Sequence, residues 1–458
     1  MGQNGDPIIL RGTSLGGWLN MENFITGHPG TESSTRAAML AVLGQEKYDY
    51  FFDRFLYHFF TEDDAKFLQT LGINSLRLAF SYKHFEDDMN PRQLKDGGFK
   101  HLDRAIDICS SHGIYTILDM HTAPGCQNQD WHSDNHTSYA AFWDFKDHQD
   151  RTVWLWEALA RRYKDNPWVT GYNLLNEPCD SQQTRVAAFY ERCEKAIRKI
   201  DPNHLLLLDG NTFAMEWKGF TSILPNTVYA IHDYIKMGFP SGSRYKGTDE
   251  QKDKLRRQFE RKCEFHIQHN VPIWNGEFGP VYESEGPDAD DINEERYRLL
   301  GEQIRIYEEA QICWSTWTYK DIGVQGMMYT SPDSAWKKLI RPFLERKQSL
   351  QVDSATCCPL EEVDSLIDPL VAWIDKVSPS ATHTYPSNWN TRNHIIRNTL
   401  QTFLATSLCE EFAELFRGKS EKELDELAGS FSSKNCVLRD ELNRIVSGHT
   451  KAGSGVQS

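Results

Sequence analysis

The sequence predicts an α/β protein built on a (β/α)8 barrel, the TIM barrel, with a helical C-terminal extension. Three observations support this fold. Eight short apolar runs occur in roughly the first 340 residues, segments of helical periodicity separate them, and no run is interrupted by polar alternation. Such runs are typical of strands that are buried on both faces. An open doubly wound sheet is the alternative, but no G-x-G-x-x-G motif follows the first run.

The predicted strands and helices alternate along the chain. The runs expected to be strands are residues 8–12, 73–80, 114–120, 169–175, 205–208, 228–231, 271–274 and 312–317. Helices are predicted at residues 102–109, 153–163, 182–200, 251–269 and 292–310. The first of these helices ends before Gly113 and the second before Pro167, as helices commonly do. This order predicts a parallel sheet that closes on itself.

The character of the chain changes after the eighth run. We expect a barrel domain at residues 1–345 and a helical extension at residues 346–458. Amphipathic patterns predict helices at residues 360–374 and 395–416 within the extension. Pro369 is expected to kink or break the first of them. The apolar face of the second leaves open a role in binding a partner protein.

Composition and charge exclude several functional classes. Fifty Lys and Arg against 65 Asp and Glu give the 458-residue chain a formal net charge of −15, so we expect no nucleic-acid partner. No window of eighteen apolar residues is present, so no membrane span is expected. The first residues lack a signal-peptide pattern and the ten cysteines include no C-x-x-C motif, which together favour a cytoplasmic protein with reduced thiols. The oligomeric state stays open.

Two glutamates directly follow predicted strands. Glu177 comes after the fourth run, within Asn-Glu-Pro, and Glu277 comes after the seventh, within Gly-Glu-Phe-Gly. Because catalytic groups of such barrels lie at the C-terminal ends of strands, both are expected at one mouth. Two carboxyl groups about 5–5.5 Å apart are the machinery of retaining glycoside hydrolysis.

Other strand ends carry side chains that this chemistry needs. Arg77 could keep a carboxylate ionised, and Asn176 could bond a sugar 2-hydroxyl. Trp317 offers an apolar face for a sugar ring. Further donors for hydroxyl or carboxylate groups are His121, His232 and Tyr234. Each of these residues taken singly is explained as well by a structural role, and their joint occurrence at strand ends favours a site.

These motifs resemble those of glycoside hydrolase family 5. The residues that carry the resemblance are Arg11–Leu19, Leu118–Asn128, Leu174–Pro178, Ile231–Tyr234, Gly276–Gly279 and Trp314–Lys320. The first two segments are similar to the exo-β-1,3-glucanase branch. The resemblance implies that Glu177 is the acid/base and Glu277 the nucleophile. It implies a supporting shell made of Arg77, His121, Asn176, His232, Tyr234 and Trp317.

The sequence therefore predicts a retaining β-glycosidase whose partner is a carbohydrate or glycoside, with β-linked glucose as the expected sugar. The alternatives are a carbohydrate-binding or scaffolding barrel without turnover, and a glycolipid- or sterol-glucoside-specific hydrolase of the same family. We expect no cofactor and no metal, because His132, Asp134 and His136 alternate without a motif such as H-E-x-x-H. A serine hydrolase is disfavoured because Ser14, in Gly-Thr-Ser-Leu-Gly, follows the first strand rather than a later one.

Overall fold

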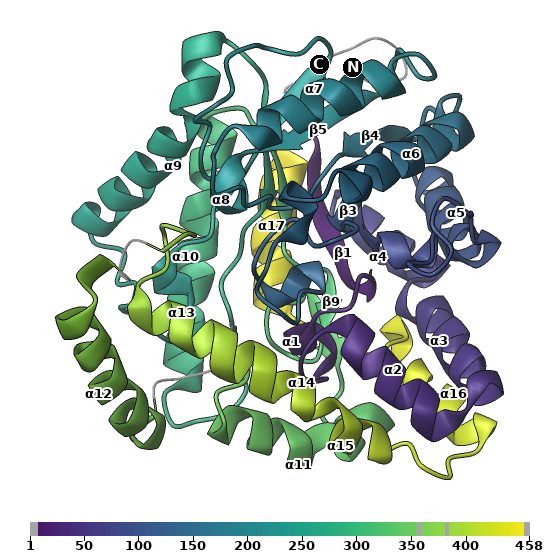
Figure 1. The fold of residues 1–458 in the computed structure, drawn as a ribbon, viewed down its shortest axis with the longest axis vertical. Coiled ribbons are helices and arrows are strands. Elements are labelled where there is room, and N and C mark those ends of the chain that lie inside the picture. The colour runs from purple at the N-terminus through teal and green to yellow at the C-terminus, as the bar shows by residue number, and fades with distance from the viewer. Residues whose placement is uncertain (1–7, 354, 356–359, 381–383, 453–458) are drawn as a thin grey trace.

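The computed structural model describes residues 8–353, 355, 360–380 and 384–452 and contains a closed barrel of eight parallel strands. The strands, in barrel order, are β1 (Arg11–Leu19), β2 (Ser75–Ser81), β3 (Tyr115–Thr122), β4 (Val169–Asn173), β5 (Leu205–Asp209), β6 (Thr227–His232), β7 (Ile273–Glu277) and β8 (Cys313–Thr316). β8 pairs with β1 and closes the barrel (Figure 1). The prediction of a (β/α)8 barrel is confirmed.

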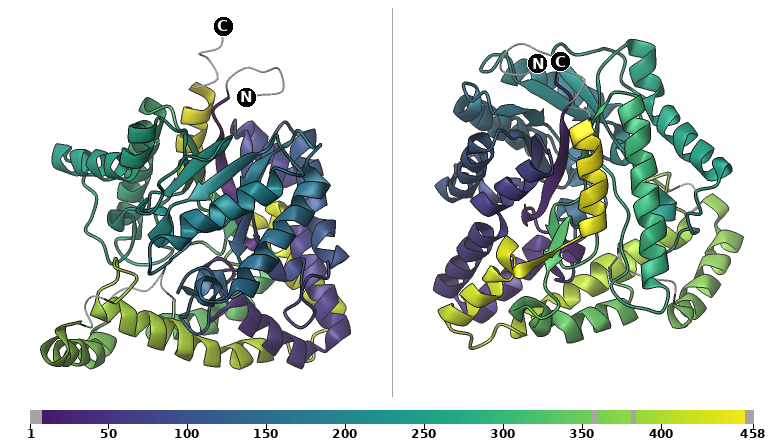
Figure 2. Two further views of the ribbon diagram at one scale, coloured as in Figure 1. Left: turned by 45° about the horizontal axis from the view of Figure 1, so that its top comes forward. Right: turned by 180° about the vertical axis from the view of Figure 1, so that it is seen from behind.

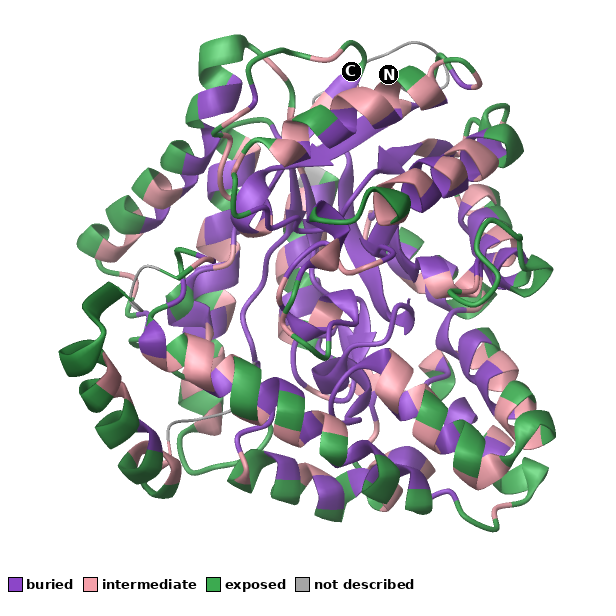
Figure 3. Cartoon of the chain, in the orientation of Figure 1, coloured by how far each residue is buried: buried purple, intermediate pink, exposed green. Residues whose placement is uncertain are grey.

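Helices surround the strands, as their periodicity predicts. The helices of the barrel layer are α2 (Glu32–Leu43), α3 (Gln45–Phe59), α4 (Glu62–Thr70), α5 (Asp96–Ser111), α6 (Lys146–Tyr163), α7 (Arg185–Ile197), α9 (Asp249–His269), α10 (Ala289–Glu309) and α11 (Ala335–Ser349). On α5, for example, Leu102, Ala105 and Cys109 are all buried, at the spacing of one helix face. The barrel is the most deeply buried part of the molecule (Figure 3).

The inside of the barrel contains an apolar cluster and, above it, a layer of polar side chains. Ile117, Leu207 and Trp274 pack together as part of a separate apolar cluster. The guanidinium of Arg77 lies 5.6 Å from the ring centre of Trp274. Because the strands are parallel, the polar side chains that come after this apolar cluster on each strand lie at the same end of the barrel.

The C-terminal region packs against the barrel helices (Figures 1 and 2). α15 (Cys409–Glu414) contacts α2, α16 (Glu421–Gly429) contacts α3, and α17 (Asp440–Ala452) contacts α10. One strand of this region, β11 (Cys436–Leu438), pairs with β10 (Met328–Thr330), which in turn pairs with β9 (Lys320–Asp321). The division at residue 345 stays a prediction, although the two parts share this small sheet.

Local expectations for the extension need correction. α12 (Glu361–Val377) continues through Pro369, so the predicted break is wrong; the helix is largely exposed, where water can satisfy the carbonyl that proline leaves unpaired. The second predicted helix is divided into α13 (Thr391–Asn398), a π-helical turn (Thr399–Leu404), α14 (Ala405–Ser407) and α15. Phe412 and Phe416 are buried against Trp336, so this part of the apolar face packs within the chain. Phe403 of the same predicted face is exposed, and a role for it in binding a partner stays a prediction.

Candidate active site

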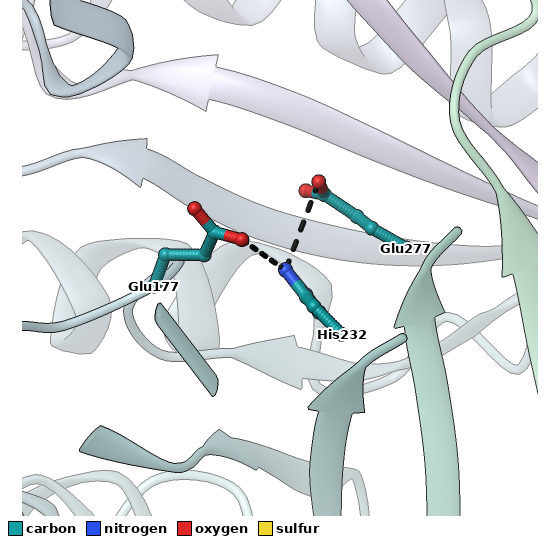
Figure 4. A group of neighbouring side chains, drawn as sticks. All are labelled: Glu177, His232 and Glu277. Atoms are coloured by element: carbon teal, nitrogen blue, oxygen red, sulfur yellow. Dashed lines mark hydrogen bonds and ion pairs between the residues drawn. The ribbon is translucent and has the colours of Figure 1, made fainter. Parts of the chain in front are cut away.

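The two predicted glutamates face one another at the C-terminal mouth of the barrel. Glu277 is the last residue of β7, and Glu177 lies four residues beyond the end of β4. A carboxylate oxygen of Glu177, a carboxylate oxygen of Glu277 and a ring nitrogen of His232 all lie within 4.8 Å of one another (Figure 4). His232 is the last residue of β6. The strand-end argument therefore placed both carboxylates in one site.

Glu277 is surrounded by donors that favour its ionised form. Its Oε1 accepts a hydrogen bond from Nη1 of Arg77, and its Oε2 accepts one from the Tyr234 hydroxyl at 2.9 Å. Burial by itself raises the pKa of Glu277, but the positive charges of His232, Arg77 and His121 outweigh burial and lower that pKa to about 2. An ionised carboxylate near neutral pH is what a nucleophile requires.

Glu177 is held by its backbone as well as its side chain. His232 Nδ1 donates to Glu177 Oε1 at 2.7 Å, and His132 Nε2 lies 3.3 Å from Oε2. The backbone N–H of Glu177 donates to Asp209 Oδ2 at 2.9 Å. Its φ of +48° is unusual for a residue with a side chain, costs about 1–3 kcal/mol, and is common at active sites. These contacts fix a backbone that aims the carboxyl group toward Glu277.

Arg77 connects Glu277 to the neighbouring strands. Its guanidinium donates to Asn176 Oδ1 at 2.7 Å and to Asn173 Oδ1 at 3.1–3.2 Å, and it forms an ion pair with Asp119 at 3.1 Å. All of these groups are buried. The arginine is thereby fixed in one orientation against Glu277.

His121 and Trp317 form a second unit beside this network. His121 Nδ1 donates to Asp119 Oδ2 at 2.8 Å, and its Nε2 lies 3.1 Å from Glu22 Oε1. Burial opposes protonation of His121, yet the charges of Asp119 and Glu22 raise its pKa to about 10. The His121 ring stacks on Trp317 with centroids 5.1 Å apart and planes 8° apart.

A cavity of about 300 Å³ opens above the two glutamates. Its lining residues are Glu22, Phe24, His121, Trp131, His132, Glu177, Tyr234, Lys236, Phe239, Pro240, Ser241, Glu277, Trp317, Gln325, Ala355 and Arg397. Five of the eight predicted site residues are in this set. The other three, Arg77, Asn176 and His232, lie one layer further in, where they contact the glutamates or one another.

Sequence reasoning did not identify several residues of the site. Asp119 had a usable signal, because a carboxylate within an apolar run, two residues before His121, points to the same face of the strand. Glu22 lies in an irregular loop after β1, and Arg397 lies far away in sequence on α13. Neither position carries a local signal. His132 belongs to the polar, aromatic loop 127–132, which the sequence predicts to recognise sugar hydroxyls, but its contact with Glu177 has no local signal.

Two other chemistries fit the site less well. Glu177, His232 and Glu277 offer three possible metal ligands, but the guanidinium of Arg77 donates to the same Glu277 carboxylate and its charge would repel a cation. Ser14 is buried in the middle of β1, with its hydroxyl 3.0 Å from that of Ser315. It is not a nucleophile at a strand-to-helix turn.

Comparisons with known proteins place the chain in a family. A family model described as cellulase (glycosyl hydrolase family 5) matches residues 48–323. A protein named beta-xylosidase from Phanerodontia chrysosporium is 51% identical over 453 residues, which cover 97% of this chain and 95% of that protein. A probable glucan 1,3-beta-glucosidase A from Emericella nidulans is 31% identical over 234 residues, which cover 49% of this chain and 57% of the relative. A solved structure titled as a glycoside hydrolase is similar in fold, with a TM-score of 0.50, 21% identity, and coverage of 69% of this chain and 90% of that one.

Proposed function

The chain belongs to glycoside hydrolase family 5, and on that premise we propose that it removes a single terminal β-linked sugar from the end of a small glycoside. It is a retaining hydrolase of O-glycosidic bonds. Glu277 is assigned as the nucleophile and Glu177 as the acid/base.

The observation that carries the proposal is the separation of the two carboxylates. An oxygen of Glu177 and an oxygen of Glu277 lie within 4.8 Å of each other. Retaining glycosidases hold their carboxyl groups about 5–5.5 Å apart, whereas inverting ones need about 6.5–9.5 Å to admit a water between them. This separation supports double displacement.

In the first step a Glu277 oxygen forms a bond to the anomeric carbon while the glycosidic C–O bond breaks. Glu177 gives its proton to the departing oxygen, so the leaving group departs as a neutral alcohol. The sugar is then joined to Glu277 as an ester. Arg77 and Tyr234 orient the carboxylate for this attack.

In the second step Glu177 takes a proton from water, and the water oxygen attacks the anomeric carbon. The bond to Glu277 breaks and the carboxylate is regenerated. His232 serves both steps, since its Nδ1 lies 2.7 Å from Glu177 and 3.7 Å from Glu277. Burial opposes its protonation, but the charges of Glu277 and Asp209 raise its pKa. The ring N–H of His232 therefore lies beside both carboxylates.

The relatives suggest two sugars. The 51% identical protein is named a beta-xylosidase, which favours a β-xyloside, and the glucan 1,3-beta-glucosidase relative supports the β-glucoside expected from the sequence. The cavity volume of about 300 Å³ lies at the small end of ligand pockets and suits one or two sugar units better than a long chain. A glycolipid or sterol glucoside stays an alternative leaving group.

A panel of p-nitrophenyl glycosides tests the proposal. We expect turnover of the β-xyloside or the β-glucoside and none of the α-anomers. Hydrolysis by Glu277→Gln should fall by several orders of magnitude on every substrate. Hydrolysis by Glu177→Gln should also fall by several orders of magnitude. Sugar binding without turnover of any glycoside would favour the non-hydrolytic barrel instead. The cytoplasmic location, which rests on sequence alone, is tested by fluorescent tagging at the C-terminus.

A further inference from the structure

The structure places part of the C-terminal extension over the mouth of the barrel. Residues 384–398, here called the C-terminal cover, include Tyr385, Trp389 and the helix α13. In Figure 1, α13 runs below the barrel strands, between α12 and α14. One side chain of the cover, Arg397, lines the same cavity as the two glutamates.

The cover is attached to two loops of the barrel. Arg397 forms an ion pair with Asp130, in the loop after β3. The Trp389 ring stacks on Phe213, in the loop after β5, with centroids 5.7 Å apart and planes 23° apart. The Tyr385 hydroxyl lies 3.0 Å from that of Thr212 in the same loop. These contacts join the extension to the site from two directions.

The loop beneath the cover is itself strained. Thr212, Phe213 and Ala214 all have φ between +54° and +59°, a left-handed conformation that residues with side chains rarely adopt. Three such residues in succession persist only where surrounding contacts enforce them, and such strain gathers at functional sites. The stack with Trp389 and the contact with Tyr385 are among those contacts.

The loop after β3 lies beside Oε2 of Glu177, and the loop after β5 packs against that loop. His132 lies 3.3 Å from Glu177 Oε2, and the His132 ring packs against Phe213 with centroids 6.2 Å apart. The acid/base donates its proton to the oxygen of the leaving group, so the leaving group must pass beside Glu177. The cover therefore lies on the leaving-group side of the cavity.

We propose that the C-terminal cover forms a wall of the leaving-group subsite and that Arg397 binds hydroxyl oxygens of the departing sugar. The Arg397 side chain is about three-quarters buried, and one nitrogen of its guanidinium, Nη1, donates a hydrogen bond to Asp130. The other N–H groups can donate to neutral oxygen acceptors. The face of the Arg397 guanidinium lies 4.5 Å from the ring centre of Trp389, which fixes its plane. The substrate class that this wall favours is a short sugar chain or disaccharide, and the inference rests on the proposed function.

The test compares two leaving groups on the same sugar. The ratio of kcat/KM for xylobiose to kcat/KM for p-nitrophenyl β-xyloside is measured in the parent and in Arg397→Met, and the cellobiose and p-nitrophenyl β-glucoside pair is measured in parallel. We expect the ratio to fall at least about tenfold, the effect of losing one hydrogen bond from a charged donor. Arg392→Met is the matched control, because Arg392 lies on the same helix but pairs with Asp364 and Asp368 of α12. It should leave the ratio within about twofold of the parent value.

A binding experiment separates this inference from the proposed function. In the Glu177→Gln background, the affinity for xylobiose relative to xylose, and for cellobiose relative to glucose, should fall in Arg397→Met even if no glycoside is turned over. If Arg397→Met fails to fold, as judged by circular dichroism, Arg397→Lys keeps the charge but offers fewer N–H groups, and its ratio decides. An unchanged ratio in the folded variant, or an equal fall in Arg392→Met, would overturn the assignment. Absence of turnover in the parent with this binding preference intact would refute only the proposed function.

Discussion

Replacing Tyr234 by Phe should make the enzyme more sensitive to acid. The Tyr234 hydroxyl donates to Glu277 Oε2 at 2.9 Å and is the donor on that oxygen, opposite Arg77 on Oε1. Burial and the charges of Glu277 and Glu177 raise the pKa of Tyr234, so the phenol stays protonated and able to donate. The substitution removes one donor from the carboxylate and leaves no cavity.

The size of the effect follows from the hydrogen bond. A hydrogen bond to a charged group contributes about 1.5–3 kcal/mol, and one pKa unit corresponds to about 1.4 kcal/mol. The bond stabilises ionised Glu277, so its loss raises the pKa of that carboxyl. Because the nucleophile must be ionised, activity is then lost at a higher pH as the solution is acidified.

The assay is kcat/KM for an aryl glycoside as a function of pH, since this quantity reports the free enzyme. The acidic edge of the profile should move up by about 1–2 pH units in Tyr234→Phe. Tyr229→Phe is a suitable control, because Tyr229 lies on β6, the strand that ends two residues before Tyr234, and its hydroxyl accepts from the backbone N–H of Leu224 instead. An acidic edge at the same pH in the parent and in a folded Tyr234→Phe would refute this account of how Glu277 stays ionised.

Three further predictions concern other parts of the structure. His132→Ala should lower kcat/KM for a methyl glycoside about 10–100-fold more than for a dinitrophenyl glycoside. The reason is that only methanol, the poor leaving group, needs a well-placed acid at Glu177. Equal losses on both substrates would contradict this prediction. The pKa of His121 is raised to about 10 from 6.5, so the stability that its protonated form contributes is complete below about pH 6.5 and is lost as the pH rises through about 10. The Tm of the parent should therefore drop more between pH 7 and pH 10 than the Tm of His121→Gln. Equal drops in the two proteins would contradict this prediction. Lys320→Met leaves a buried carboxylate unpaired and should lower the free energy of unfolding by about 3–5 kcal/mol in urea titrations, whereas Lys338→Met, at an exposed pair, should change it by less than about 1 kcal/mol.

The barrel was predictable because its strands are buried on both faces. A run such as Ile114–Met120 has no polar alternation, and it corresponds to β3 within a few residues. The boundaries were less predictable. β1 begins at Arg11, near the end of the predicted run, and continues through three glycines to Leu19 because neighbouring strands supply its hydrogen bonds. Tertiary pairing rather than local propensity determines that strand.

The meeting of the two glutamates was predictable for a topological reason. Parallel strands deliver their C-terminal ends to one mouth, so Glu177 and Glu277 meet although one hundred residues separate them. No comparable rule places Arg397 beside Asp130, which lies 267 residues away. β11 is three residues long, and its partner β10 is equally short. Contacts of this kind depend on how the extension packs, which a single sequence does not reveal.

The central claim is that Glu277 attacks the sugar and forms a covalent ester while Glu177 supplies and recovers the proton. Incubation with an activated 2-deoxy-2-fluoro β-glycoside slows the second step and allows intact-protein mass spectrometry to detect the intermediate. We predict one fluoro-sugar per chain, located on Glu277 by peptide mapping, with no adduct in Glu277→Gln. A label on another residue, or hydrolysis of an aryl β-glycoside that releases the sugar as its α-anomer, would contradict the account.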